Sequence, residues 1–124
     1  MRATVLGLVG VLMVVGGAQA GGAVYEANGR DVSASLKVQA DASGKSTARY
    51  DLVSHGCIGE ISGDLVKLSD AEMLLSADDA SGGQCKVRIT QSGKSVTLRE
   101  DDSGNCSYFR GASCVFGQVL SLRK

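Results

Sequence analysis

Two copies of the tetrapeptide Ser-Gly-Lys-Ser are the first feature of this sequence that could do chemistry, because Gly-Lys-Ser closes the phosphate-binding loop of many nucleotide-binding proteins. They occupy Ser43-Gly44-Lys45-Ser46 and Ser92-Gly93-Lys94-Ser95. The full motif needs a second glycine five residues earlier, where this chain has Gln39 and Arg88. Serine and glycine also favour tight turns, and a hairpin tip has no following helix to hold a phosphate. We therefore expect two hairpin tips, no nucleotide and no cofactor.

A histidine two residues before a cysteine is the second candidate for chemistry. An imidazole beside a thiolate can form a nucleophile, but a disulfide sulfur cannot serve as one. Since Cys57 is expected to be oxidised, we predict that His55 is an exposed loop residue. The chain also lacks the Gly-x-Ser-x-Gly turn of many serine hydrolases. The sequence thus predicts that this protein is not an enzyme.

Two acidic stretches offer oxygen ligands of the kind that calcium prefers. They are Asp78-Asp79, followed by Gly82-Gly83, and Glu100-Asp101-Asp102, followed by Gly104-Asn105. Neither stretch has the alternating aspartates that would point successive side chains at one ion. We expect solvated turns and no metal site.

Four cysteines and a single histidine favour disulfides over zinc. An even number of cysteines in a small exported chain indicates two disulfides and an oxidising compartment. The spacing favours Cys106–Cys114, because seven intervening residues can fold back far enough for the bond. It also favours Cys57–Cys85, because each of these two residues opens a predicted strand. Cys57–Cys106 is the second choice.

The first twenty residues have the pattern of a secretory signal. Arg2 precedes the apolar run Val5–Val15, which is short for a membrane span, and Ala18-Gln19-Ala20 is a small-x-small cleavage site. We expect cleavage after Ala20 and a single domain over residues 21–124, periplasmic or secreted; a retained membrane anchor is the alternative. Without Arg2, twelve basic residues face thirteen acidic ones, so no basic field would hold nucleic acid or a membrane.

Short alternating stretches separated by glycine and small polar residues predict an all-β fold. In Asp31–Ala40, apolar side chains occupy every second position. Further strands are expected around residues 48–52, 57–63, 65–68, 85–90, 96–99 and 114–122. Ala71–Ala77 contains good helix formers, but its short length and its neighbours favour a strand. The expected architecture is a small antiparallel β-barrel or sandwich of seven to eight strands, braced by disulfides.

The chain partly repeats itself after 49 residues. Eight identities within 21 positions align the two Ser-Gly-Lys-Ser tetrapeptides, and they also align Cys57 with Cys106. One explanation is a pair of similar hairpins, each leading to a cysteine. The other is that Ser-Gly is good turn chemistry and the remaining matches are coincidental.

The export signal, the size, the β architecture and the C-terminal cysteines resemble those of the periplasmic or membrane-bound inhibitors of c-type lysozyme. One loop of that family carries a Ser-Gly-x-x-Tyr type of motif, which Ser43-Gly44 and Ala48-Arg49-Tyr50 resemble, with three extra residues after Gly44. A second family loop ends in Lys-Gly. Ser54-His55-Gly56 is similar to it but lies too close to Tyr50, so this motif is missing or displaced.

The resemblance implies that a hairpin tip enters the acidic cleft of the lysozyme and binds its catalytic carboxylates. The residues it assigns to partner binding are Ser43, Gly44, Lys45, Ser46, Arg49 and Tyr50. The alternative function is an envelope structural or ligand-binding module that acts on no enzyme. Inhibition of lysozyme by the mature chain would distinguish the two.

Overall fold

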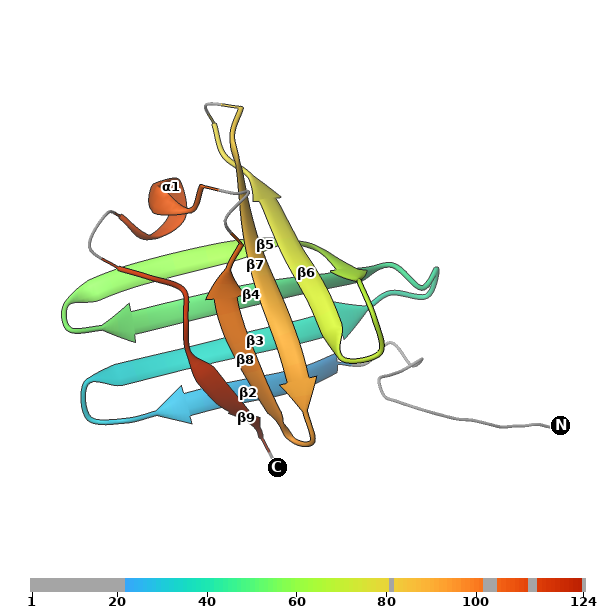
Figure 1. Ribbon diagram of the computed structural model, residues 1–124, viewed down its shortest axis with the longest axis horizontal. Coiled ribbons are helices and arrows are strands. Elements are labelled where there is room, and N and C mark those ends of the chain that lie inside the picture. The colour runs from blue at the N-terminus through green and yellow to red at the C-terminus, as the bar shows by residue number, and fades with distance from the viewer. Residues whose placement is uncertain (1–21, 81, 102–104, 112–113, 124) are drawn as a thin grey trace, which may run out of the picture.

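The computed structural model describes residues 22–80, 82–101, 105–111 and 114–123, and the predicted signal segment 1–20 lies outside these ranges. Eight strands of the described chain pair in sequence order, all antiparallel, and the first strand also pairs with the last. The result is a closed barrel (Figure 1). The predicted all-β fold with two disulfides is therefore confirmed, and of the two expected architectures the barrel is the observed one.

The elements carry the labels of Figure 1. They are β2 (Gly22–Asn28), β3 (Val32–Ala40), β4 (Ser46–Ser54), β5 (Cys57–Lys67), β6 (Glu72–Asp78), β7 (Gln84–Ser92), β8 (Ser95–Glu100), α1 (Ser107–Arg110) and β9 (Val119–Leu122).

The period of two in the sequence decides which side chains fill the barrel. Successive residues of a strand point to opposite faces, so every second apolar residue turns inward. On β3 the inward residues Ala34 and Leu36 are buried, while Ser33 and Lys37 are exposed. The other strands follow the same rule. Fully buried side chains include Leu36, Tyr50, Leu52, Ile61, Leu75, Val87, Ile89, Leu98 and Leu120.

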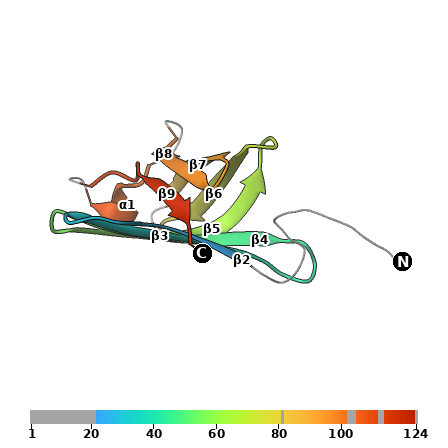
Figure 2. The same ribbon diagram turned by 90° about the horizontal axis from the view of Figure 1, so that it is seen from below.

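The barrel is flattened into two layers that share one strand. Figure 2 shows β2 to β5 as a flat layer, with β6 to β9 crossing above it. The first part of β5 pairs with β4 and the last part with β6, and Asp64 takes part in both ladders. A Cβ atom on Gly63 would lie 2.0 Å from the carbonyl oxygen of Ser76. Glycine is therefore required where the two layers meet.

Three sequence expectations are resolved by the strands. The stretch 71–77 is a strand, as predicted, since all of it but Ala71 belongs to β6. The two expected strands over 57–63 and 65–68 are one continuous strand, β5. The expected last strand over 114–122 is wrong in length, because only Val119–Leu122 pairs with its neighbours.

The residues before β9 cross one end of the barrel instead of extending the sheet. Phe116 is fully buried, and its ring packs against Gly59. A Cβ atom added to Gly59 would lie only 2.7 Å from the nearest ring carbon. The ring also meets Tyr50 edge to face, with 5.5 Å between the centroids. The Tyr50 hydroxyl bonds to the side-chain oxygen of Gln118. This packing holds the residues before β9 across the barrel end, and for this reason the pairing with β8 begins only at Val119.

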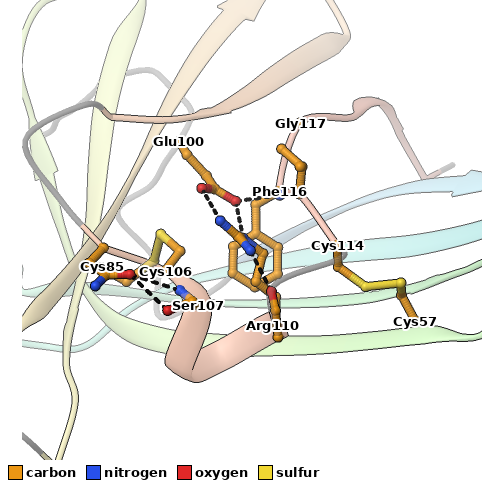
Figure 3. A network of polar contacts seen from close by, with 12 residues as sticks. Cys57, Cys85, Glu100, Cys106, Ser107, Arg110, Cys114, Phe116 and Gly117 are labelled. Carbon is orange, nitrogen blue, oxygen red and sulfur yellow. Dashed lines mark hydrogen bonds and ion pairs between the residues drawn. A yellow bond between two sulfur atoms is a disulfide. The ribbon is translucent and has the colours of Figure 1, made fainter.

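An ion pair fastens the same end of the barrel (Figure 3). Arg110 of α1 donates to Glu100 of β8, with 2.9 Å between Nη2 and Oε1, and the backbone N–H of Phe116 donates to Oε2 at 2.8 Å. Burial raises the pKa of Glu100, but the hydrogen bonds from Arg110 and Phe116 and the charge of Arg110 outweigh it, so the net pKa is lowered. Glu100 therefore stays ionised and holds the crossing segment in place.

Two disulfides also hold this segment, but with a different pairing from the one expected. The bonds join Cys57 to Cys114 and Cys85 to Cys106, so Cys106–Cys114, Cys57–Cys85 and the second choice Cys57–Cys106 are all wrong. The Cα–Cα distances of the observed pairs are 5.8 and 4.5 Å. All four cysteines are oxidised, as predicted, which indicates an oxidising, non-cytoplasmic compartment.

The strand register explains the correction. Cys85 pairs with Ala77 of β6, and the β5–β6 register continues from Asp64–Ser76 to place Ala77 level with Gly63. Cys57 lies six residues farther along β5, which is about 20 Å at the rise of a strand. No disulfide spans that distance. The segment that crosses the barrel end instead has Cys106 beside Cys85 of β7 and Cys114 beside Cys57 of β5. Each of these two cysteines therefore bonds to the strand next to it.

In the described ranges, no helix has the length and apolar character needed to cross a membrane.

Candidate functional site

The loop between β3 and β4 extends beyond the body of the barrel (Figures 1 and 2). It comprises residues 41–45, all of them exposed, and Ser46 opens β4 in a half-buried position. Ser43, Gly44 and Lys45 thus form a protruding tip, which agrees with the hairpin predicted from the sequence. We call residues 41–45 the β3–β4 tip.

One aspartate braces the β3–β4 tip from within. The Oδ1 atom of Asp41 accepts hydrogen bonds from the Ser43 hydroxyl at 2.6 Å, the Ser43 N–H at 2.9 Å and the Lys45 N–H at 3.0 Å. Backbone bonds from Gly44 N–H to Asp41 C=O and from Asp41 N–H to Lys45 C=O close the loop. The hydrogen bond from the Ser43 side chain is the main cause of a lowered pKa of Asp41. These bonds hold the tip in one conformation, and a loop that is ordered in advance loses less entropy on binding than a mobile one.

The cation of the tip is only loosely held. Lys45 Nζ lies 3.5 Å from Asp64 Oδ1 on β5, and the two side chains are 61% and 63% exposed. Exposed ion pairs of this kind contribute little to stability. Lys45 can therefore exchange Asp64 for a carboxylate on a partner at small cost.

Arg49 lies on the outer face of β4, away from the tip. Its Nε donates to Asp51 Oδ2 at 3.1 Å, and its Nη2 pairs with Glu60. These contacts, the hydrogen bond to Asp51 first, raise the pKa of Arg49. Arg49 shares a strand with Ser46 but not the tip, so a partner that contacts both must cover part of the flat layer.

Tyr50 does not belong to a binding surface, which corrects its assignment as a partner-binding residue. It is fully buried in the core, and burial raises its pKa well above the usual range. The physical reason lies in the strand alternation, because Tyr50 faces inward with Ala48 and Leu52. Five of the six residues assigned to partner binding therefore remain accessible, and only Ser43, Gly44 and Lys45 lie together in the tip.

The second Ser-Gly-Lys-Ser tetrapeptide also forms a hairpin tip, but of another kind. Ser92 pairs directly with Ser95, so only Gly93 and Lys94 form the turn between β7 and β8. The β3–β4 tip has five residues and this turn has two, so their lengths differ by an odd number. Equivalent residues of the strands that follow therefore point to opposite faces of the sheet. Tyr50 is buried, whereas Arg99, 49 residues later, is exposed. The repeat in sequence is therefore not a repeat of the same hairpin. The residues after the two tips form the strands β4 and β8, and not the helix that a phosphate-binding loop requires.

His55 and Cys57 do not form a nucleophilic pair. His55 and Gly56 are the two central residues of the turn between β4 and β5, with φ values of 50° and 82°, as a type I′ turn requires. His55 is exposed, and Cys57 is bonded to Cys114. The predicted exposed loop histidine is thus confirmed.

The acidic stretches participate in local structure. Asp79 accepts a hydrogen bond from the Gly83 N–H at 2.8 Å, and Asp101 pairs with Arg88 at 3.0 Å. Asp102 lies outside the described residues. Among the residues that are described, no group of three or more His, Cys, Asp or Glu side chains could hold a metal ion.

A shallow polar groove beside the tip was not predicted from the sequence. It lies on the outer face of β3, β4 and β5 and has a volume of about 450 Å³. Its lining consists of Lys37, Gln39, Thr47, Ala48, Arg49, Ser62, Gly63 and Asp64. The sequence carries only one signal for it, the polar residues that alternate with the core residues on these strands. Which of them become neighbours depends on the register between three strands.

The fold and these surfaces define a small disulfide-braced β-barrel with a protruding hairpin tip and a polar groove next to it. No model of a known protein family matches the sequence, and neither a curated protein nor a solved structure is detectably similar to the chain.

Asp41→Ala is expected to loosen the β3–β4 tip without unfolding the barrel. The change removes three hydrogen bonds to Oδ1, while the side chain itself packs against nothing in the core. Backbone ¹⁵N order parameters of residues 42–45 should fall from about 0.85 to below about 0.6. Asp70→Ala, in another exposed turn, is the control that should leave the tip unchanged.

The same bracing has a defined pH dependence. The folded pKa of Asp41 is lowered, so the bracing is fully present above the ordinary aspartate pKa and is lost as the pH falls through the lower folded value. Order parameters that stay high in Asp41→Ala, or that fall in the wild type already near neutral pH, would contradict this role.

Proposed function

We propose that the mature chain is a periplasmic or secreted protein-binding domain, not an enzyme, that inhibits c-type lysozyme by inserting the β3–β4 tip into the active-site cleft. The observation that supports this most is the tip itself, in which Asp41 holds Ser43 and Lys45 in an ordered, protruding loop. A lysozyme cleft carries two carboxyl groups at its catalytic centre. A hydroxyl and an ammonium group on a rigid loop are suitable donors to them.

The proposal gives each tip residue a separate role. Ser43 turns its hydroxyl from Asp41 to a catalytic carboxyl group, while its N–H stays on Asp41. Lys45 supplies the cation, and Gly44 keeps the loop narrow because it has no side chain. Lys45 leaves its weak pair with Asp64 on entry. Arg49 remains outside the cleft, where it contacts the rim of the enzyme, and Tyr50 only supports the fold from the core.

The test is a cell-wall lysis assay with hen egg-white lysozyme and micromolar mature protein. The wild type should inhibit, and Ser43→Ala and Lys45→Ala should each weaken inhibition roughly tenfold to a hundredfold, the range expected for a lost hydrogen bond to a charged group. Lys94→Ala is the matched control, because Lys94 occupies the other Gly-Lys tip and should leave inhibition unchanged.

Two results would overturn the proposal. The first is lysozyme activity that is unchanged by micromolar wild-type protein. The second is inhibition that persists in the double variant of Ser43 and Lys45, which would place the inhibitory surface elsewhere on the barrel. Tyr50→Ala is not informative, because it removes a buried core side chain.

A further inference from the structure

The polar groove is built from two rows of side chains that cross three strands. Strand register places Lys37, Arg49 and Ser62 opposite one another in one row, and Gln39, Thr47 and Asp64 in the next. All six point outward, because the residues between them on the same strands face the core. Ala48 and Gly63 pair between the rows, and their backbones form the floor of the groove there, since the Ala48 side chain faces the core.

The first row brings two cations together. Lys37 and Arg49 are directly opposite each other on β3 and β4, where Cβ atoms are about 5 Å apart and like charges repel. Arg49 uses Nε and Nη2 on Asp51 and Glu60, and its Nη1 has no partner among the described residues. Lys37 has no hydrogen-bond or ion-pair partner in the same ranges of the chain. The carboxylates of Asp51 and Glu60 offset part of the Arg49 charge, and an anion between Lys37 Nζ and Arg49 Nη1 would accept hydrogen bonds from the donors that remain.

The remaining lining can form hydrogen bonds with hydroxyl groups. Ser62 and Thr47 provide hydroxyls that donate and accept, Gln39 provides an amide, and Asp64 keeps one carboxylate oxygen free of Lys45. None of the described residues that line the groove is aromatic. Its volume of about 450 Å³ falls in the range of small-molecule sites.

We propose that this groove binds a sugar acid, a saccharide unit that carries a carboxylate. The carboxylate lies between Lys37 and Arg49, and the sugar hydroxyls lie over Gln39, Thr47, Ser62 and Asp64. The groove is open and its charges are exposed, so we expect millimolar affinity for a single unit. This site shares Arg49 with the proposed lysozyme contact but adds Lys37, which is not part of the β3–β4 tip, so variants of Lys37 distinguish the two.

The test is a titration of the ¹⁵N-labelled mature protein with D-glucuronate, followed by amide chemical shifts. D-glucose is the matched probe, because it carries a hydroxymethyl group in the place of the carboxylate and is otherwise the same sugar. Glucuronate should shift the amides of residues 37–39, 47–49 and 62–64 saturably, whereas glucose should not at the same concentrations. Raising the ionic strength should weaken binding.

Lys37→Ala should weaken glucuronate binding roughly two- to fivefold, the range for one exposed charge pair, while Lys94→Ala leaves it unchanged. Lys37 is exposed, so the variant should keep the amide spectrum of the folded barrel. The proposal fails if glucuronate causes no saturable shifts, if glucose or acetate binds as well as glucuronate, or if Lys37→Ala binds like the wild type. None of these outcomes bears on lysozyme inhibition, which is read from a different assay and different variants.

Discussion

Phe116→Ala is expected to lower the free energy of unfolding by about 3–5 kcal/mol, the usual cost of truncating a buried phenylalanine. Phe116 is fully buried, although it lies in an irregular segment and not in a strand. Its ring fills the space above Gly59 and meets Tyr50 edge to face. Alanine would leave a cavity at the barrel end that the surrounding strands cannot close, because the two disulfides and the Glu100–Arg110 pair hold the segment in place.

Urea denaturation of the oxidised protein measures this effect. Tyr108→Ala is the matched control, because it truncates an aromatic residue of the same segment that is 63% exposed. Its cost should stay within about 0.5 kcal/mol. If Phe116→Ala and Tyr108→Ala cost the same, the segment does not close the barrel in the way described.

Non-reducing peptide mapping is expected to show two linked pairs, Cys57 with Cys114 and Cys85 with Cys106. Trypsin makes the result unambiguous, because it cuts after Arg49, Lys67, Lys86, Arg99 and Arg110 and so places each cysteine in a peptide of its own. Free thiols should be blocked at acidic pH before digestion, so that the bonds do not exchange. A linked peptide that joins Cys57 to Cys85, or Cys106 to Cys114, would contradict the structure.

Removing either disulfide should destabilise the barrel strongly, and to different extents. The sequence separations are 57 residues for Cys57–Cys114 and 21 for Cys85–Cys106. Loop-closure entropy then gives a cost of about 4 kcal/mol for the first bond and about 3 kcal/mol for the second. Double alanine variants, measured by urea denaturation, test this order. Equal stability of a double variant and the wild type would contradict a structural role for that bond.

The inward faces of the strands could be predicted from the sequence because side chains alternate with a period of two. Leu36, Leu52, Val87 and Leu98 all lie in the core at positions that the pattern indicates. The same pattern placed Tyr50 with Ala48 and Leu52, and it was the correct guide to that residue. The motif resemblance placed Tyr50 on a binding surface instead, and it did not take the direction of the side chain into account.

The tertiary structure alone decided which cysteines bond and which polar residues share a groove. Both depend on register, which shifts whole strands along one another and leaves the alternation of each strand unchanged. Cys85 is level with Gly63 and not with Cys57 because β5 changes its partner from β4 to β6 near Asp64. Lys37, Arg49 and Ser62 come from three separate strands and are neighbours because of the register of β3 with β4 and of β4 with β5. A local pattern predicts which face of the sheet a side chain occupies. The position of the residue along the barrel axis depends instead on how all eight strands pair to close the barrel.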